Sequence, residues 1–247
     1  MSAPLLQVRG LSRAFGGLRA VDALSFDAGE GEIVGLLGPN GSGKTTALNL
    51  ISGALVPDRG SVRFAGAELA GAPAYRVVRA GIARTFQLVR VFRSMTVREN
   101  VQAGLRFGRS ARHGGHRDDE QALLDRVGLG AQAARMASEL TYIDQKRLEL
   151  ARALALQPRL LLLDEWLAGL NPSELVEGVR LIRALHEAGM TVLMVEHVMD
   201  AIRSLCDRCV VMNSGARIAE GTPAEVLSDA RVVQAYLGDD DLEAADV

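Results

Sequence analysis

Eight consecutive residues have the types and spacing of a loop that cradles phosphate groups. They read Gly-Pro-Asn-Gly-Ser-Gly-Lys-Thr and fit the pattern G-x-x-x-x-G-K-[ST] in full. Glycines let successive backbone N–H groups turn toward phosphate oxygens without a Cβ in the way. Lys44 can place a positive charge on the β- and γ-phosphates, and the Thr45 hydroxyl can ligate Mg²⁺. We expect this loop and the residue after it to hold a nucleotide: Gly38, Pro39, Asn40, Gly41, Ser42, Gly43, Lys44, Thr45 and Thr46.

The neighbours of this loop supply the structural context that the motif requires. Residues 33–37 form a short apolar run typical of a buried strand, and a helix is expected to begin near Lys44. The N-terminus of that helix would add the positive end of its dipole to the phosphate site. The alternative is a glycine-rich loop that only turns the chain, and the flanking strand and helix make this the minority interpretation.

A second motif consists of two adjacent acids after another apolar run. Residues 160–163 are four leucines, and Asp164 and Glu165 follow them. A carboxylate at the end of a buried strand can complete the shell of a nucleotide-bound Mg²⁺, so Asp164 is the expected residue on the metal side. Glu165 could orient or deprotonate an attacking water. Two solvated acids would be the alternative, but together with the phosphate loop the pair indicates a Mg²⁺-dependent nucleotide hydrolase.

The elements that must position these residues alternate between short strands and helical stretches. We expect further strands at 62–64, 191–195, 210–212 and 216–219, the last two joined by a hairpin turn with Gly215 at positive φ. This alternation predicts an α/β fold with a largely parallel sheet. Strand signals vanish between residues 88 and 153, where we predict a helical insertion that contains a polar loop at 110–119.

Composition limits the domain organisation and the function classes. The chain has 247 residues with 48% hydrophobic and 23% charged residues, an ordinary globular mixture. A net charge of −2 offers no basic surface for nucleic acid, so we expect no nucleic-acid partner. No apolar run approaches the length of a membrane span. We expect one domain over 1–247, with a sheet core at 1–87 and 154–225, the helical insertion at 88–153, and a C-terminal helix with a frayed acidic tail at 226–247.

The order of further residues resembles one family of P-loop proteins. No Asn-Lys pair is present, as a guanine-binding motif would need. Instead, the chain presents in order Phe15, the phosphate loop, Gln87, Leu140-Thr141-Tyr142-Ile143-Asp144-Gln145, Asp164-Glu165, Asn171 and His197. In this order the whole chain resembles the ATP-binding subunits of ABC transporters. The resemblance implies ABC ATPase architecture: a P-loop NTPase (RecA-like) sheet core with an inserted helical subdomain.

Within that family the chain resembles the ATP-binding subunits of branched-chain amino acid importers. The Arg84-Thr85-Phe86-Gln87 string is the most specific feature. A closing Tyr-Leu-Gly also occurs in lipopolysaccharide-export ATPases and discriminates less. The remaining matching strings are Phe15-Gly16-Gly17-Leu18, Met95-Thr96-Val97-Arg98-Glu99-Asn100, Ala168-Gly169-Leu170-Asn171-Pro172, Val195-Glu196-His197 and Ala235-Tyr236-Leu237-Gly238.

The resemblance implies a role for each matching residue. Phe15 would stack on adenine, with simple core packing as the alternative. Gln87 would sense the γ-phosphate and ligate Mg²⁺ beside Thr45 and Asp164, and its amide offers both a donor and an acceptor. His197 would bind the γ-phosphate, so Glu165, His197 and Gln87 form the expected catalytic set. Thr141 would contact nucleotide through the signature segment, and Asn171 would lie in the loop that joins the two nucleotide sites of a dimer.

Two residues depart from the pattern of the family. The signature segment normally reads Leu-Ser-Gly-Gly-Gln, or Leu-x-Tyr-Gly in the importers, but here Ile143 replaces the glycine that lets a helix N-terminus approach the partner's γ-phosphate. We expect its β-branched side chain to hinder close approach and to resist positive φ. Trp166, the only tryptophan, stands where the family has proline after Glu165, and it could either shift that carboxylate or pack outward.

The resemblance also implies the biological role. The chain would bind and hydrolyse ATP to power import of branched-chain amino acids or a similar small polar solute. It would act with a second ATP-binding subunit (homo- or heterodimer, with a heterodimer favoured by Ile143), with transmembrane permease subunits, and indirectly with a periplasmic solute-binding protein. It would lie peripherally on the cytoplasmic face of the inner membrane. The alternatives are the ATPase of a lipopolysaccharide-type exporter and a nucleotide-binding subunit whose hydrolysis is weak because of Ile143.

Overall fold

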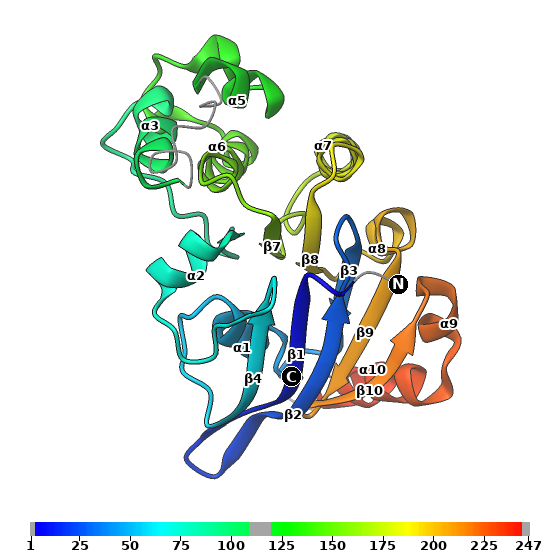
Figure 1. The fold of residues 1–247 in the computed structure, drawn as a ribbon. Helices are drawn as coiled ribbons and strands as arrows, with labels where there is room; N and C mark the ends of the chain where they lie inside the picture. Colours follow the sequence, from blue (N-terminus) through cyan, green and yellow to red (C-terminus); the bar gives the residue numbers. More distant parts are fainter. Residues whose placement is uncertain (1–2, 109–119, 244–247) are drawn as a thin grey trace.

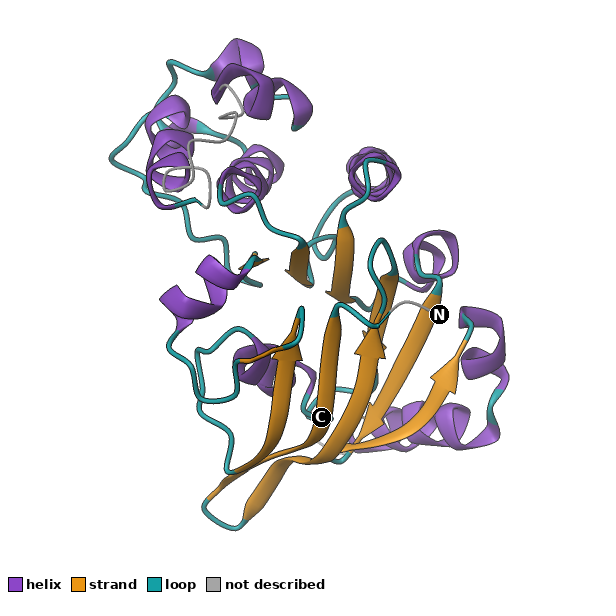
Figure 2. Cartoon of the chain, in the orientation of Figure 1, coloured by secondary structure: helices purple, strands orange, loops and turns teal. Residues whose placement is uncertain are grey.

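A computed structural model of the chain describes residues 3–108 and 120–243. There, helices pack behind, above and beside two β-sheets and leave the front of β1 (Leu6–Phe15), β2 (Leu18–Ala28) and β4 (Arg59–Phe64) uncovered (Figures 1 and 2). The polar loop expected at 110–119 lies outside these residues. One sheet has six strands and the other has four. Mixed helices and sheets confirm the predicted α/β class.

The six-stranded sheet positions the candidate site. Its order is β10-β9-β3-β8-β7-β6, and every pairing is parallel except that of β10 with β9. The inner strands β3, β7 and β8 are buried along their whole length, which explains their uninterrupted apolar sequences. The strands are β3 (Ile33–Leu37), β6 (Ile82–Arg84), β7 (Leu160–Asp164), β8 (Thr191–Val195), β9 (Arg208–Asn213) and β10 (Ala216–Gly221).

The hairpin between β9 and β10 has the turn that its sequence predicts. Ser214 and Gly215 both adopt left-handed backbone angles, with φ of 48° and 83°. Such turns match the twist of the two flanking strands. The prediction of glycine at positive φ is therefore confirmed.

The four-stranded sheet is antiparallel, and the sequence analysis did not anticipate it. Its order is β2-β1-β4-β5. The strand predicted at 62–64 is longer than expected and belongs to this sheet. One signal was available: Leu6 and Val8 are buried on alternate positions of the first strand, as in a sheet with one covered face. The strands are β1 (Leu6–Phe15), β2 (Leu18–Ala28), β4 (Arg59–Phe64) and β5 (Ala67–Glu68).

The helices group into those around the sheets and those of the insertion. The helices are α1 (Lys44–Ile51), α2 (Ala74–Ala80), α3 (Val97–Phe107), α5 (Glu120–Arg126), the 3₁₀ turns η1 (Gly130–Gln132) and η2 (Ala137–Glu139), α6 (Tyr142–Ala155), α7 (Pro172–Glu187), α8 (Met199–Leu205), α9 (Pro223–Ser228) and α10 (Ala230–Glu243). In Figure 1 α3, α5 and α6 form a helical part at one end. Helix α6 runs two residues past the boundary expected at 153. Helix α10 extends through the backbone of residues 239–241, and fraying of the acidic tail stays a prediction.

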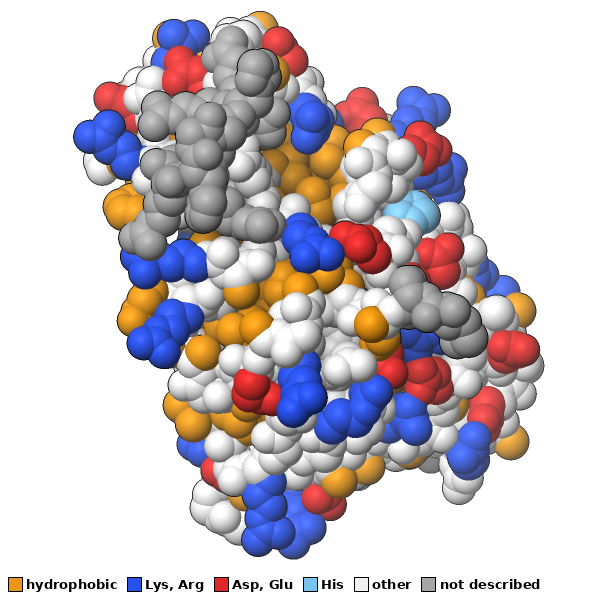
Figure 3. All heavy atoms as spheres, in the orientation of Figure 1, with side chains coloured by type: hydrophobic (Ala, Val, Ile, Leu, Met, Phe, Trp, Pro, Cys, Tyr) orange, Lys and Arg blue, Asp and Glu red, His pale blue; other side chains and the backbone are white. Residues whose placement is uncertain are grey.

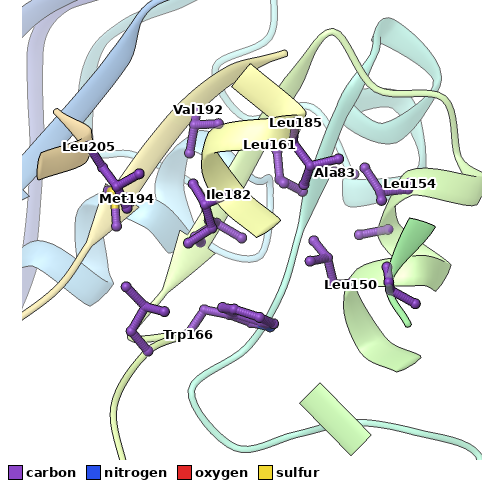
Figure 4. Close-up of a cluster of buried hydrophobic side chains, with 14 of the residues drawn as sticks. Ala83, Leu150, Leu154, Leu161, Trp166, Ile182, Leu185, Val192, Met194 and Leu205 are labelled. Atoms are coloured by element: carbon purple, nitrogen blue, oxygen red, sulfur yellow. The ribbon is translucent and has the colours of Figure 1, made fainter. Parts of the chain in front are cut away.

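Two hydrophobic clusters hold the layers together. Alternate residues of β3 serve both: Ile33 and Leu37 belong to the cluster under α6, α7 and α8, whereas Val34 and Leu36 belong to the cluster between the two sheets and α1. Figure 4 shows part of the first cluster, with Trp166 near Ile182. Because β3 is held on both faces, the loop that follows it leaves from a fixed point.

Candidate active site

The phosphate loop joins the end of β3 to α1 in a conformation that requires glycine at two positions. Gly38 has φ of 145° and Gly43 has φ of 101°. A Cβ on Gly38 would lie 2.1 Å from the carbonyl oxygen of Met212, and one on Gly43 would lie 2.1 Å from that of Ala20. The loop is therefore packed directly against backbone of β9 and β2, which keeps its N–H groups in place.

The side chains of this loop divide between the interior and the surface. Lys44 is buried, and its Nζ donates hydrogen bonds to the carbonyl oxygens of Gly38 (2.7 Å) and Pro39 (2.8 Å). Thr45 is exposed in the first turn of α1, where its hydroxyl is accessible to a ligand. The N–H of Gly38 donates to the hydroxyl of Tyr236 (2.9 Å), which ties α10 to the start of the loop.

Asp164 lies at the end of β7 in a buried ion pair. Its Oδ2 accepts a hydrogen bond from Nη2 of Arg84 at 2.7 Å, and both side chains are almost wholly buried. Arg84 also donates to Asn49 on α1 at 2.7 Å, so the pair connects β7 to the helix behind the phosphate loop. The second oxygen, Oδ1, is buried and has no hydrogen-bond partner among the described residues. An unsatisfied carboxylate oxygen next to a phosphate loop fits the requirement of a Mg²⁺ shell.

Removing the charge of Asp164 is expected to destabilise the fold as well as the site. In Asp164→Asn, the buried Arg84 guanidinium keeps its charge but loses its counter-ion. Breaking such a pair on one side costs about 3–5 kcal/mol of the free energy of unfolding, measurable by urea denaturation. In the matched control, Asp22→Asn, an exposed pair with Arg19 is broken, and the loss should stay below about 1 kcal/mol. Equal losses in the two variants would contradict this view of Asp164.

The catalytic residues expected from the sequence meet at one carboxylate. Gln87 Nε2 donates to Oε2 of Glu165 at 2.7 Å, and His197 Nε2 lies 3.1 Å from Oε1, where the tautomer protonated on Nε2 donates. The three residues follow β6, β7 and β8, which are neighbours in the sheet. Carboxyl ends of parallel neighbours lie at one edge, so the topology itself brings these side chains together.

The backbone of Glu165 is strained. Its φ of 50° lies in the left-handed region, which costs a non-glycine residue about 1–3 kcal/mol. The conformation is held in part by its N–H, which donates to the carbonyl oxygen of Val195 at 2.8 Å. This conformation turns the chain directly after Asp164. The carboxylate of Asp164 therefore meets Arg84, whereas that of Glu165 meets Gln87 and His197.

Three other predicted residues, Phe15, Thr141 and Asn171, have no hydrogen bond to the phosphate loop in the part of the chain that the structure describes. Thr141 and Asn171 are exposed N-caps: Thr141 Oγ1 accepts from the N–H of Asp144, and Asn171 Oδ1 accepts from the N–H groups of Ser173 and Glu174. Figure 1 shows α6, which begins after Thr141, in the helical part and apart from α1. Phe15 is 45% exposed, which makes the core-packing alternative wrong and leaves adenine stacking a prediction.

Comparison with known proteins identifies the family. Residues 21–168 match the ABC transporter family. The chain belongs to the ABC transporter ATP-binding family. Residues 216–241 of this ABC ATP-binding subunit also match a family described as branched-chain amino acid ATP-binding cassette transporter. Membership establishes that the subunit binds nucleotide and hydrolyses ATP, and it confirms the P-loop NTPase fold class.

Individual relatives cover nearly the whole subunit. It is 43% identical over 254 residues to the high-affinity branched-chain amino acid transport ATP-binding protein LivG of Salmonella typhimurium, covering 97% of this chain and 100% of LivG. It is 33% identical over 235 residues to the lipopolysaccharide export system ATP-binding protein LptB of Escherichia coli K12, covering 95% and 98%. The crystal structure of the ADP conformation of an ATP-binding cassette of an ABC transporter has a TM-score of 0.85 and 30% identity, covering 96% of this chain and all of that one.

The ABC subunit accommodates Ile143 differently from the sequence expectation. Ile143 lies in the first turn of α6, and its φ is not positive. The expected backbone conflict is therefore wrong, because this position is helical. The side chain is only 8% exposed, so most of it packs inward rather than in front of the helix N-terminus.

Trp166 packs inward as well, so the expected outward alternative is wrong. It is 1% exposed and belongs to the cluster beneath α6 and α7. A Cβ on Gly178 of α7 would lie 3.2 Å from the indole and 2.7 Å from a methyl of Leu167. The missing side chain at Gly178 thus provides the space that the large ring needs, and Glu165 keeps both of its hydrogen bonds.

Glu196 belongs to the Val195-Glu196-His197 string, from which the sequence alone indicates no role for it. It is buried, and its Oε1 accepts the N–H of Leu167 at 2.7 Å. Burial, with the negative charge of Glu165 nearby, raises the pKa of Glu196 to about 7. Arg84 and Tyr236 also belong to strings that resemble the family. Their roles become visible only in the structure, where Arg84 pairs with Asp164 and Tyr236 accepts from the N–H of Gly38.

The pKa of Glu196 predicts a pH-dependent stability. The folded subunit keeps this proton to higher pH than the unfolded chain, whose carboxyl titrates near 4.5. The free energy of unfolding should therefore fall as the pH rises from about 4.5 to about 7, by on the order of 3 kcal/mol. Urea unfolding of Glu196→Gln should lack this contribution, so the difference between parent and variant should change across that range. Parallel pH dependences would show that Glu196 is not responsible.

Proposed function

We propose that this ABC subunit hydrolyses ATP to power import of branched-chain amino acids or a similar small polar solute. The observation that carries the hydrolytic part is the Glu165 carboxylate, held between Gln87 and His197 beside the buried Asp164. The higher identity to LivG than to LptB, together with the match at residues 216–241, supports import over lipopolysaccharide export.

The residues of the loop would bind the triphosphate and its metal. Backbone N–H groups of the loop and the Lys44 ammonium would surround the β- and γ-phosphates. Thr45, Asp164 and Gln87 are the residues that would hold Mg²⁺, and Asp164 offers an oxygen, Oδ1, that no other described residue bonds. Bound Mg²⁺ supplies charge neutralisation on the phosphate oxygens.

Glu165 would act on the attacking water. Its carboxylate can accept a hydrogen bond from water and then its proton, while Gln87 and His197 keep it oriented. His197 would also contact the γ-phosphate, for which an imidazole N–H is a suitable donor. Phosphoryl transfer depends mostly on the positions of the reacting groups and on neutralisation of their charge. A carboxylate fixed in this way would position the attacking water.

A second ATP-binding subunit would complete the site. Thr141 and Asn171 lie on exposed helix N-termini, as residues that reach across a dimer would. Because Ile143 packs inward and Thr141 stays exposed, either a homodimer or a heterodimer would bring a partner's signature segment to the γ-phosphate held by this subunit. The weakly hydrolysing alternative would follow if the partner lacked such a segment.

Permease subunits would dock on an apolar groove beside the insertion. A cavity of about 720 Å³ opens between α2, α3 and α6. Figure 3 shows hydrophobic side chains along the boundary between the helical part and the sheets. An amphipathic cytoplasmic helix of a permease fits a groove of this kind. Its apolar lining includes Val78, Phe86, Phe92, Phe107 and Leu156.

The cellular setting follows from the same proposal. Among the described residues, none of the helices combines the length and apolarity required to cross a bilayer. The subunit would lie peripherally on the cytoplasmic face of the inner membrane, held by its permease partners. A periplasmic solute-binding protein would deliver the solute to those partners without touching this chain.

Transport by the assembled complex tests the proposal. The subunit is purified with its partner and permeases, placed in proteoliposomes, and supplied with labelled leucine, the periplasmic binding protein and ATP. ATP-dependent leucine uptake above that of the Glu165→Gln complex would support import. Extraction of lipopolysaccharide from the vesicles would instead establish the exporter alternative.

A further inference from the structure

Lysine is scarce in this chain, and one of its lysines has no role in the site described above. Of the 28 basic residues, only Lys44 and Lys146 are lysines. Lys146 lies on α6 and is 2% exposed. An ammonium group has three N–H donors on a single nitrogen, whereas the N–H donors of a guanidinium lie in one plane on three nitrogens. A buried site with three converging carbonyl groups therefore favours lysine over arginine.

Such a site surrounds Lys146. Its Nζ donates hydrogen bonds to the carbonyl oxygens of Ala168 (2.7 Å), Trp166 (2.8 Å) and Glu165 (3.3 Å). The three acceptors belong to the segment that directly follows β7. All three N–H bonds of the ammonium are thus used on the backbone around the catalytic carboxylate.

Trp166 returns a hydrogen bond to the same helix. Its indole Nε1–H donates to the carbonyl oxygen of Lys146 at 3.2 Å. The ring is fixed in the hydrophobic cluster, where Gly178 leaves room for it. We call these four hydrogen bonds between Lys146 and residues 165–168 the α6 clamp.

The opposite side of the same segment is fixed to β8. The N–H of Glu165 donates to Val195, and the N–H of Leu167 donates to the carboxylate of Glu196. The segment is therefore suspended between a strand of the sheet and a helix of the insertion. Glu165 holds its strained backbone angle between these two attachments, so a shift of α6 would be transmitted to the backbone that carries its carboxylate.

We propose that Lys146 and Trp166 are positioning residues for hydrolysis. The α6 clamp holds the backbone of Glu165 so that its carboxylate meets Gln87 and His197, and it makes that position depend on the orientation of α6. The exposed N-terminus of α6 carries Thr141, so a partner that engages this end acts on the carboxylate of the same chain. The inference rests on the proposed role of Glu165 as the residue that activates water.

Steady-state ATP hydrolysis by the complex, with Lys146→Met and Trp166→Phe, tests the clamp. Both changes keep an apolar side chain in place and remove the N–H donors. We expect kcat to fall about 10- to 100-fold, the effect of a displaced catalytic group, with KM for ATP within twofold of the parent. Lys146→Arg keeps the charge but not the three converging bonds, so it should also lose at least tenfold in kcat. The matched control, Arg63→Met in the exposed antiparallel sheet, should hydrolyse ATP like the parent.

The double variant separates the clamp from two independent packing effects. If both residues serve one clamp, Lys146→Met with Trp166→Phe should lose about as much as the more damaged single variant. The proposal would be overturned if the double variant lost kcat by the product of the two single losses, or if the variants changed only KM. Full turnover by Lys146→Met or by Lys146→Arg would also overturn it. Glu165→Gln is measured in parallel: parental hydrolysis there would overturn the role of Glu165 itself, whereas its inactivity beside an unaffected Lys146→Met would overturn only the clamp.

Discussion

Replacing Glu165 with glutamine is expected to lower ATP turnover by a factor of about 10²–10⁴ while leaving ATP binding intact. The amide keeps the size of the side chain and can still accept from His197, but it cannot take a proton from water. Phosphate release at saturating ATP measures the loss, and equilibrium dialysis with ATP measures binding.

The same variant should accumulate in an ATP-bound dimer with its partner subunit. In the proposed dimer, ATP holds the two subunits together until it is hydrolysed, so light scattering after gel filtration should show a larger mass for this variant with ATP than without it. Glu187→Gln, at the exposed end of α7, is the matched control and should behave like the parent. Hydrolysis by Glu165→Gln at the parental rate would show that another group activates water.

Replacing Lys44 with methionine is expected to weaken ATP binding by a factor of about 30 or more. The change keeps the buried stem but removes the ammonium that would bind the β- and γ-phosphates in the proposed site. Loss of one partner from a desolvated charged contact costs about 2–5 kcal/mol, and about 1.4 kcal/mol corresponds to tenfold in affinity. Titration with a fluorescent ATP analogue and Mg²⁺ measures the dissociation constant.

The second lysine provides the control for this prediction. Lys146→Met removes a buried ammonium of the same kind from the same chain, but its bonds go to backbone near Glu165 rather than to the phosphate loop. It should therefore bind the analogue within about twofold of the parent. Tight binding by Lys44→Met would contradict the assignment of the phosphate site, which both the function and the mechanism need.

Much of the candidate site could be predicted because its chemistry is local. The phosphate loop is contiguous, and the glycines at 38 and 43 are needed by the backbone itself. Glu165 and His197 each lie two residues after an apolar run of the length typical of a buried strand. Once those strands are parallel neighbours, their carboxyl ends lie at the same edge of the sheet. The side chains that follow them are then close together.

Other features depend on partners that are remote in the chain and could not be derived from it. A lone tryptophan after Glu165 gives no sign of its direction until Gly178, on a different helix, provides space for the ring. The concern over Ile143 was wrong in its backbone part for a similar reason. Its helical geometry follows from the cap at Thr141, whereas a general expectation about glycine pointed to positive φ.

The sequence by itself therefore determined the phosphate loop, the adjacent acids and the α/β class, because each depends on residue types at fixed short spacing. Only the tertiary structure decided the antiparallel sheet, the Arg84–Asp164 pair and the contacts of Lys146 with residues 165–168. Those contacts join residues far apart in the chain, and their geometry exists only after packing has excluded water and fixed the helices against the sheets.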